Sequence, residues 1–239
     1  MALVWDFDHS MIMENSDVLL IQNIDSSFLE KKSVFPVWTD FMNFCFQSFD
    51  TSPECIRNTV AQLRIHEDIL RVIKQFHDSD SKQHVLSDAN VFFIRELLRF
   101  HGVETCFSEI IANPAEFDSR GKLAISRFTS ADSPHGCSRC PLNLCKGREL
   151  VKLVDLSDTD QIVFYVGDGR GDFCPALALR EYDVVFARER FPLASLIRNQ
   201  EIRAKVVFWD DHEALAKALI NSLSNTYSMS DPPREELKF

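Results

Sequence analysis

The sequence lacks the long apolar runs and the excess of basic charge that mark several common classes of protein. No stretch approaches the ~18 uncharged apolar residues of a membrane-spanning helix. The N-terminus has no basic start followed by an apolar run, so we expect no secretory signal. The formal net charge is −10, which argues against a surface for nucleic acid or anionic membrane.

The cysteines also lack the even, closely spaced pattern of a disulfide framework. Seven are dispersed along the chain, and they are better interpreted as free thiols in a cytosolic protein. The 239 residues are 45% hydrophobic and include 20 phenylalanines, enough for one large domain or a domain with an insertion. In so acidic a protein, an anionic substrate would need a local positive site or a bound cation.

A short apolar segment at residues 3–5 is followed closely by two acids, Asp6 and Asp8. This pattern predicts a buried strand that ends in a polar loop, with both acids leaving on roughly the same side. Two neighbouring carboxylates are costly unless a cation or a proton separates them. The pair suits a nucleophile beside a proton donor with a metal ion alongside, although alone it also fits an acidic surface turn.

Residues 12–78 predict helices and no strand. Ser16 is a plausible N-cap, and a second helix start combines Thr51 with Glu54 as a capping box and Pro53 in the first turn. We therefore expect a helical insertion placed directly after the first strand.

From residue 79 onwards, predicted strands alternate with helices. Apolar runs predict strands at 84–86, 110–112, 162–166, 184–186 and 206–208. A Ser-Arg-Gly turn at 119–121 predicts a hairpin. Continuous apolar strands between helices indicate an α/β fold with a parallel sheet covered on both faces, whose ligands bind beyond the carboxyl ends of the strands. The polar residues from about 225, with two consecutive prolines, predict a disordered tail.

Three further polar segments follow predicted strands or open predicted helices. Ser87 and Asp88 join a strand to a helix, where a hydroxyl and backbone N–H groups can cradle phosphate. Lys146 opens a helix and can offer a positive charge to a phosphoryl oxygen. Asp168 follows an apolar strand and can ligate a hard divalent ion, with Asp172 bracing the site. Oxygen ligands without clustered histidines favour Mg²⁺ over zinc.

The order of these motifs resembles the haloacid dehalogenase superfamily. Two additional motifs resemble, more narrowly, the phosphocholine/phosphoethanolamine phosphatase-like family: Asp-Phe-Cys-Pro at 172–175 and Cys-Ser-Arg-Cys-Pro at 137–141. That family also includes members acting on pyridoxal phosphate, thiamine monophosphate and pyrophosphate. The resemblance implies a Rossmann-like core of residues 1–11 and 79–224, a helical (C1-type) cap at 12–78, and a Mg²⁺-dependent phosphatase for a small phosphorylated metabolite.

The resemblance also implies a role for each matching residue. Asp6 attacks phosphorus to form an aspartyl-phosphate, and Asp8 protonates the leaving group and later activates water. Ser87 and Lys146 hold the phosphoryl oxygens. The implied metal ligands are Asp6, Asp8, Asp168 and Asp172. To donate a proton near neutrality, Asp8 must titrate about two to three units above ~3.9, and we expect burial under the cap and nearby carboxylates to cause this.

Residues at the leaving-group pocket of the family bear on the substrate. Acids at Asp17 and Asp88 would suit the cationic amine of phosphoethanolamine or phosphocholine, although helix capping is an alternative for both. Arg170 and Gly171 differ from the residue types that are more common at these positions of the family's motif. Arg170 either favours a substrate with a second phosphate, such as pyrophosphate, or points to solvent. An aromatic stripe beginning at Trp38 is expected to pack between cap helices, and one ring would suit a choline-type cation.

A cysteine-rich loop leaves a further question open. His135, Cys137, Cys140 and Cys145 resemble zinc ligands, but their spacing is irregular and no second Cys-x-x-Cys completes the set. Packing of the loop that delivers Lys146 is favoured, with metal binding or redox sensitivity as alternatives. Two rival functions are disfavoured: dehalogenation, because those relatives lack an acid at the position of Asp8, and a non-catalytic interaction protein, because all four motifs are intact.

Overall fold

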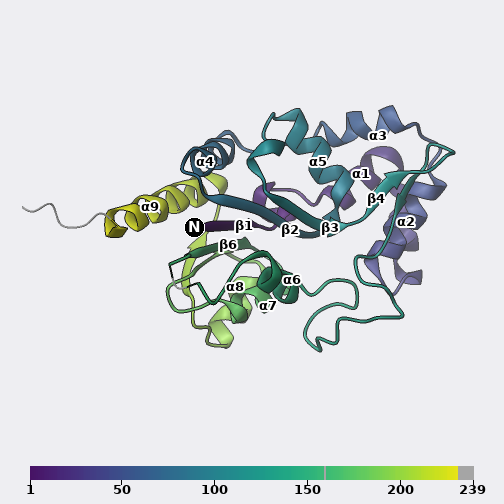
Figure 1. Cartoon of the computed structure of the whole chain (residues 1–239). Helices are drawn as coiled ribbons and strands as arrows, with labels where there is room; N and C mark the ends of the chain where they lie inside the picture. The colour runs from purple at the N-terminus through teal and green to yellow at the C-terminus, as the bar shows by residue number, and fades with distance from the viewer. Residues whose placement is uncertain (159, 231–239) are drawn as a thin grey trace, which may run out of the picture.

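The computed structural model describes residues 1–158 and 160–230, the last four of these by their backbone alone. Within that part of the chain, six parallel strands form the central sheet in the order β3-β2-β1-β6-β7-β8 (Figure 1). They are β1 (Ala2–Trp5), β2 (Lys82–Asn90), β3 (Glu109–Asn113), β6 (Val163–Gly167), β7 (Val184–Arg188) and β8 (Lys205–Trp209). The chain leaves β1 in one direction for β2 and β3 and in the other for β6 to β8, so a ligand-binding crevice is expected beyond the end of β1.

Alternation along β1 explains why the sheet is covered on both faces. Leu3 and Trp5 join one apolar cluster and Ala2 and Val4 the other, and all four are fully buried. The helices of the first cluster include α4 (Glu67–Asp78), α5 (Val91–Phe100) and α9 (His212–Ser230), and the helices inserted after β1 also contribute to it. Three contribute to the second: α6 (Lys146–Leu153), α7 (Phe173–Ala178) and α8 (Pro192–Asn199). The α/β class predicted from the sequence is confirmed.

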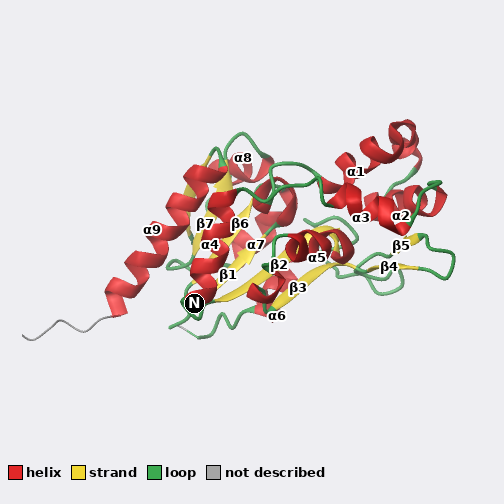
Figure 2. Ribbon diagram, turned by 90° about the horizontal axis from the view of Figure 1, so that it is seen from above, coloured by secondary structure: helices red, strands yellow, loops and turns green. Residues whose placement is uncertain are grey.

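The helices inserted after β1 lie to one end of the sheet, together with a hairpin (Figure 2). The inserted elements are α1 (Ser16–Asp25), the 3₁₀ segment η2 (Ser26–Val34), α2 (Trp38–Ser48) and α3 (Pro53–Val60). The hairpin of β4 (Ala115–Phe117) and β5 (Leu123–Ile125) packs against α2, and the turn predicted there is confirmed.

Helix α4 was expected to belong to the cap, but it packs against α9 and β2 of the core (Figure 1). An isolated antiparallel bridge between Ile12 and Ile65 joins the two chain segments that lead to and from α1–α3. The contacts of α4 therefore group it with the helices of the core, and the domain boundary at residue 78 stays a prediction. Helical spacing alone could not show this, because an apolar stripe looks the same whether it packs on a cap or on a sheet.

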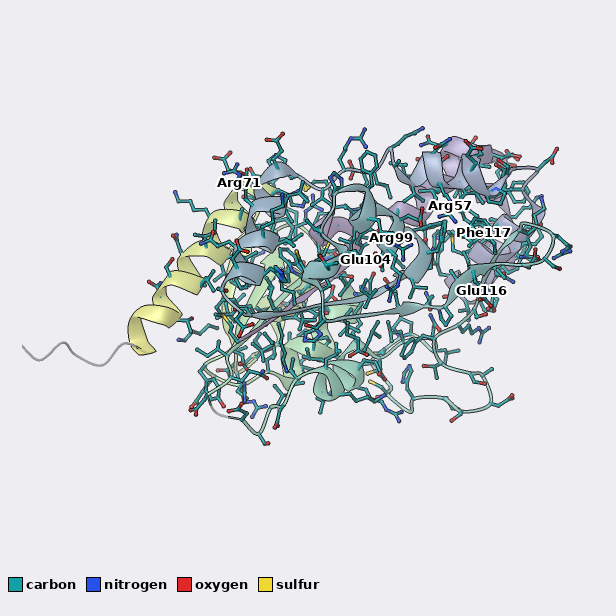
Figure 3. The ribbon with its side chains drawn as sticks, turned by 45° about the horizontal axis from the view of Figure 1, so that its top comes forward. Arg57, Arg71, Arg99, Glu104, Glu116 and Phe117 are labelled. Atoms are coloured by element: carbon teal, nitrogen blue, oxygen red, sulfur yellow. The ribbon has the colours of Figure 1, made fainter. Side chains whose placement is uncertain are left out.

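Arg57 of α3 links the cap to the core on the outer side. Its guanidinium lies 2.6 Å from a carboxylate oxygen of Glu96 on α5 and over the rings of Phe92 and Phe117 (Figure 3). Because the Arg57 side chain is 46% exposed, the ion pair contributes no more than about 1 kcal/mol.

Helix ends differ from the sequence prediction in three places. Asn15, not Ser16, caps α1, and Ser52, not Thr51, caps α3, because Pro53 fits best at the first helical position and the residue before it becomes the cap. Helix α9 extends to Ser230 and so includes the first residues of the segment predicted as a disordered tail, which stays a prediction. Residues 231–239 of the predicted tail lie outside the described residues.

No helix among the described residues has the length and apolar character needed to cross a membrane.

Candidate active site

A tight turn after β1 carries the first two acids into a shared cavity. The chain folds into a single π-turn over Phe7–Met11, and both Asp6 and Asp8 line the cavity. His9 in this turn has a φ of 57°, which costs a non-glycine residue roughly 1–2 kcal/mol. Its carbonyl accepts a 2.6 Å hydrogen bond from Arg188, a mostly buried side chain at the end of β7, which holds the turn in place.

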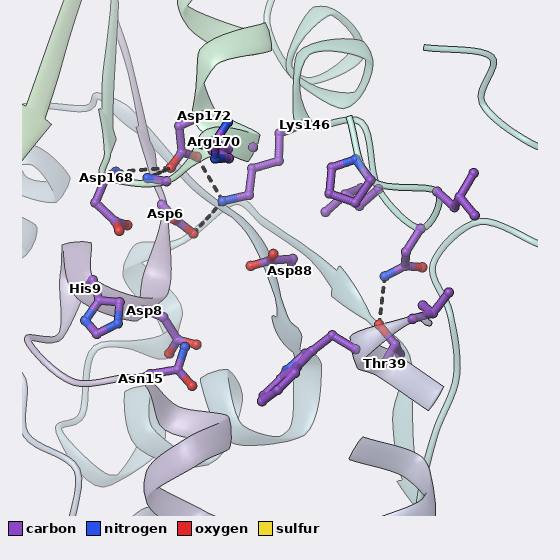
Figure 4. Close-up of a pocket in the computed structure, with 18 of the residues that line it drawn as sticks. Asp6, Asp8, His9, Asn15, Thr39, Asp88, Lys146, Asp168, Arg170 and Asp172 are labelled. Atoms are coloured by element: carbon purple, nitrogen blue, oxygen red, sulfur yellow. Dashed lines mark hydrogen bonds and ion pairs between the residues drawn. The ribbon is translucent and has the colours of Figure 1, made fainter. Parts of the chain in front are cut away.

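Lys146 lies at the floor of the cavity, between two acids from distant parts of the chain (Figure 4). Its Nζ is 2.8 Å from Oδ1 of Asp6 and 2.9 Å from Oδ1 of Asp172, and the residue is only 3% exposed. Burial by itself would lower the pKa of Lys146, but the charges of the two carboxylates outweigh it and raise that pKa. The lysine is therefore a fixed cation beside Asp6.

Asp172 accepts hydrogen bonds on both of its oxygens. Oδ1 accepts from Lys146 and, at 2.7 Å, from the hydroxyl of Tyr165. Oδ2 accepts from the backbone N–H groups of Asp168 at 3.0 Å and Gly169 at 2.8 Å. Burial would raise the pKa of Asp172, yet Lys146 and these donors lower it below its usual value. The side chain is a charged brace that shapes the loop after β6.

Three other acids of the cavity, Asp6, Asp8 and Asp168, have raised pKa values. Burial raises the pKa of Asp8 to about 7, against the opposing hydrogen bond from the Ser16 backbone N–H, which is 2.9 Å long. Burial and the Asp172 charge raise the pKa of Asp168 to about 7 and also raise that of Asp6. The shift expected for Asp8 is thus present in the structure, with burial as its main cause.

The acids also form a set of donor atoms that fits Mg²⁺. Carboxylate oxygens of Asp6, Asp168 and Asp172 lie within 4.8 Å of one another. All of them are hard oxygen donors, and crowded buried carboxylates with raised pKa values are stabilised by a divalent cation. Asp168 also has a free oxygen, since only its Oδ1 accepts the 3.2 Å bond from Ser10. Asp172 is the least suited to ligate directly, because both its oxygens are already engaged.

The cavity has a volume of about 680 Å³ and lies between the core, the cap and the cysteine-rich loop (Figure 4). The cap contributes residues 36–39, including Trp38, and the loop contributes residues 141–144. Arg170 lines the cavity from an exposed position. Sequence reasoning missed His9, Asn15, Thr39 and Asn143, because single polar residues carry no periodic or motif signal.

The predicted substrate-binding residues occupy different positions. Asp88 is exposed and lines the cavity. Ser87 is fully buried and accepts a 3.1 Å hydrogen bond from the N–H of Ala89. Asp17 does not line the cavity; its Oδ2 accepts a 2.6 Å hydrogen bond from the indole N–H of Trp38, and burial raises its pKa well above the usual value. Asp17 therefore contacts a cavity-lining residue through its hydrogen bond to Trp38, and the neighbouring charge of Asp8 also raises its pKa.

A buried hydrogen-bond network holds the cap, sheet and loop together beside the cavity. The side-chain amide of Asn143 donates to Thr39 of α2 at 3.0 Å and to Asn113 of β3 at 2.7 Å. Asn143 also accepts from the N–H of Phe128 at 2.7 Å, and Asn113 donates to the carbonyl of Asp88 at 2.6 Å. Hydrogen bonds among Thr39 of the cap, Asn113 of the sheet and Asn143 of the loop therefore hold these three segments together beside the cavity.

A parallel sheet that brings an acid pair, a buried lysine and an acidic loop into one capped cleft defines the class of haloacid dehalogenase-type phosphatases. The chain belongs to the family named Putative Phosphatase, whose sequence profile matches residues 1–223. It is 35% identical over 241 residues to a thiamine phosphate phosphatase-like protein of Arabidopsis thaliana, covering 96% of this chain and 98% of the relative. It is 31% identical over 242 residues to inorganic pyrophosphatase 2 of the same plant, covering 96% and 86%.

Among solved structures, a haloacid dehalogenase family hydrolase from Salmonella enterica has the same fold. The TM-score is 0.61 at 13% identity, over 87% of this chain and 67% of that one, a likeness that concerns the fold alone. Family membership and the named relatives identify this chain as a phosphatase.

Proposed function

We propose that the chain hydrolyses a small phosphate monoester with a cationic leaving group, through an aspartyl-phosphate on Asp6, with phosphoethanolamine and phosphocholine as the first candidates. The observation that carries the chemistry is the ion pair between Lys146 and Asp6 at the floor of a cavity that also contains Asp8. A nucleophile, a cation and a group that holds a proton near neutrality lie together there.

The reaction then has two steps. A carboxylate oxygen of Asp6 attacks phosphorus, the bond from phosphorus to the leaving oxygen breaks, and Asp8 donates its proton to that oxygen. Asp8, now a carboxylate, takes a proton from water as the water oxygen attacks phosphorus, and the bond to Asp6 breaks to release phosphate. Covalent catalysis divides a slow hydrolysis into two easier displacements.

Charge neutralisation in both steps comes from fixed groups. In this proposal Lys146 and the hydroxyl of Ser87 hold the phosphoryl oxygens, together with N–H groups at the start of α5; Ser87 is fully buried and is not among the residues that line the cavity. Mg²⁺, when bound, would be held by the carboxylates of Asp6 and Asp168 and the backbone carbonyl of Asp8, and would neutralise charge on the phosphoryl group. Asp172 keeps Lys146 and the loop after β6 in position.

The cavity wall favours a positively charged leaving group. Trp38 lines the cavity, and its N–H is fixed by Asp17. An aromatic ring of this kind attracts an organic cation by about 0.5–2 kcal/mol. The exposed carboxylate of Asp88 adds negative charge on the same wall. Thiamine monophosphate carries the same type of cation and belongs to the same class of substrate.

The test is a substrate panel measured with Mg²⁺: phosphocholine, phosphoethanolamine, thiamine monophosphate, pyridoxal phosphate, pyrophosphate and p-nitrophenyl phosphate. Asp6→Asn should abolish turnover of every substrate. Trp38→Leu should raise KM for phosphocholine roughly 2- to 30-fold, the range equivalent to the cation–π energy, while leaving KM for p-nitrophenyl phosphate nearly unchanged. Phe44→Leu, an aromatic change on the same helix at a residue that does not line the cavity, is the matched control. Turnover that survives Asp6→Asn would contradict the mechanism, and equal KM changes for both substrates would contradict the cation site.

Pyrophosphate is a second candidate because Arg170 lines the cavity. A guanidinium can bind a second phosphoryl group through two parallel hydrogen bonds. A substrate with an amine leaving group has no second phosphoryl group and does not require this contact. If pyrophosphate is the substrate, Arg170→Gln should lower its kcat/KM by roughly 10- to 100-fold, the range for a lost hydrogen bond between charged groups, and spare the monoesters. If pyrophosphate were turned over faster than every other substrate of the panel and Arg170→Gln lowered its kcat/KM in this way, pyrophosphate would replace the monoesters as the proposed substrate.

A further inference from the structure

Four cysteines converge on one side of the phosphatase cleft. Cys137, Cys140 and Cys145 come from the loop that precedes α6, and Cys174 comes from α7, which follows the acidic loop. Their sulfur atoms all lie within 4.8 Å of one another. Sequence reasoning considered the first three with His135 and missed Cys174, which is separated from Cys145 by 28 residues.

The distances between the sulfurs suit a metal ion better than a disulfide. Cys137 Sγ and Cys174 Sγ are 3.7 Å apart. Four thiolates at ~2.3 Å from a tetrahedral Zn²⁺ would be separated by ~3.8 Å, whereas a disulfide needs ~2.05 Å.

His135 is excluded as a ligand by its own hydrogen bonds. Its Nδ1 accepts from the N–H of Cys137 at 3.0 Å, so Nε2 carries the proton and donates to the carbonyl of Pro141 at 2.7 Å. Both ring nitrogens are therefore engaged in shaping the loop, and the fourth donor is Cys174.

We propose that Cys137, Cys140, Cys145 and Cys174 bind one Zn²⁺ ion in a closed tetrathiolate site. With four protein ligands no coordination position remains for substrate, so the ion is structural. Binding releases the protons of those sulfurs that are still thiols, and no oxidation or reduction occurs.

The site connects the two segments that build the phosphate-binding floor. Cys145 directly precedes Lys146, and Cys174 follows Asp172 by two residues. The packing between these segments is tight: a Cβ on Gly147 would lie 2.8 Å from the backbone carbon of Cys174. The zinc ion would therefore hold the loop that delivers Lys146 against the helix that follows its partner Asp172.

The test measures metal in the full chain, purified under reducing conditions without chelator from zinc-supplemented medium. Elemental analysis should find about one zinc per chain, and cobalt substituted for zinc should give the intense sulfur-to-metal absorption of tetrahedral thiolate coordination. Cys174→Ser should lower the zinc content at least about fivefold, since it removes one of four ligands. Cys55→Ser, at an exposed cysteine of α3 outside the cluster, should leave it unchanged.

A second measurement does not depend on the folding of any variant. In the zinc-loaded wild-type chain, a mercurial thiol reagent should modify the four cysteine sulfurs, and the amount of zinc released should increase in proportion to the number of sulfurs modified. Three results would overturn the proposal: a chain without zinc whose four thiols react freely, a mass deficit of two hydrogens that shows a disulfide among these cysteines, or iron in place of zinc. Because zinc content is read without substrate, failure here is distinct from failure of the proposed phosphatase chemistry.

Discussion

Replacing Lys146 with methionine tests the charge arrangement at the floor of the cleft. Methionine has nearly the same length but no charge, so the buried carboxylates of Asp6 and Asp172 would face each other without a cation. Removing one partner of a buried, hydrogen-bonded ion pair costs about 3–5 kcal/mol, because the remaining charge is uncompensated. For a chain of this size, about 2–4 °C of Tm corresponds to 1 kcal/mol, so we expect Tm to fall by roughly 6–20 °C.

The assay is thermal and urea unfolding of the wild type and Lys146→Met in the absence of divalent metal. Without the lysine, the folded-state pKa of Asp6 should rise further, so the folded variant binds protons that the unfolded chain does not. Its stability should therefore fall as pH increases, and the deficit should be larger at pH ~8 than at pH ~5. Phosphatase activity should fall at least about 100-fold, as for loss of one preorganised donor to a reacting phosphoryl group.

Lys152→Met is the matched control on the same helix. Its ammonium pairs with Glu149 at 2.7 Å, but the lysine side chain is 57% exposed, so the change should cost less than about 1 kcal/mol. If Lys146→Met lost no more stability than Lys152→Met, or if its deficit were the same at both pH values, Lys146 would not be the counter-charge that the geometry indicates.

Three further predictions concern pH, packing and metal. Burial lowers the pKa of His212 from 6.5 to about 4, so between these pH values the unfolded chain binds a proton that the folded chain does not. The free energy of unfolding of the wild type should therefore rise with pH across this window, by about 3 kcal/mol more than that of His212→Gln. Urea midpoints measured between pH ~4 and ~8 test this. Equal slopes in the two proteins would contradict this assignment. Gly167→Ala should destabilise by about 1–3 kcal/mol, because its Cβ would lie 2.6 Å from Cγ of Asp172, whereas Gly171→Ala meets only ordinary contacts and should be nearly neutral in thermal unfolding. Mg²⁺ at 100 times its Kd should stabilise the wild type by about 2.7 kcal/mol, and calorimetry should show this gain largely lost in Asp168→Asn; a gain that persisted would place the ion elsewhere.

The sequence predicted most of the core, because its strands are buried on both faces. A strand in this position must be apolar throughout, so 162–166 and 184–186 stand out without any knowledge of their neighbours. The ends of α5 also have local causes, since the Asn90 side chain caps its start and Gly102, just after its end, has a φ of 66°. The convergence of Asp6 and Asp168 followed from the rule that the carboxyl ends of parallel strands meet at one edge of the sheet, whereas Lys146, which opens a helix, was expected there from the family resemblance.

The tertiary structure decided matters in which one residue type can serve several partners. Asp17 was expected to contact substrate; its buried carboxylate accepts a hydrogen bond from the indole of Trp38 and does not line the cavity. The apolar stripe of α4 does not determine whether the helix packs on the cap or on the core sheet. Cys174 could not be assigned to the cysteine cluster from the sequence, because 28 residues separate it from Cys145.

What the sequence alone determined are the features with short-range causes: strand and helix positions, turn chemistry, and the motifs at the strand ends. What only the three-dimensional arrangement decided are the long-range ones: the pKa shifts of Asp6, Asp168 and Asp172, the packing of α4 against the core, and the meeting of four sulfurs. The physical reason is that burial and electrostatic coupling depend on distances between segments, and local patterning does not contain those distances.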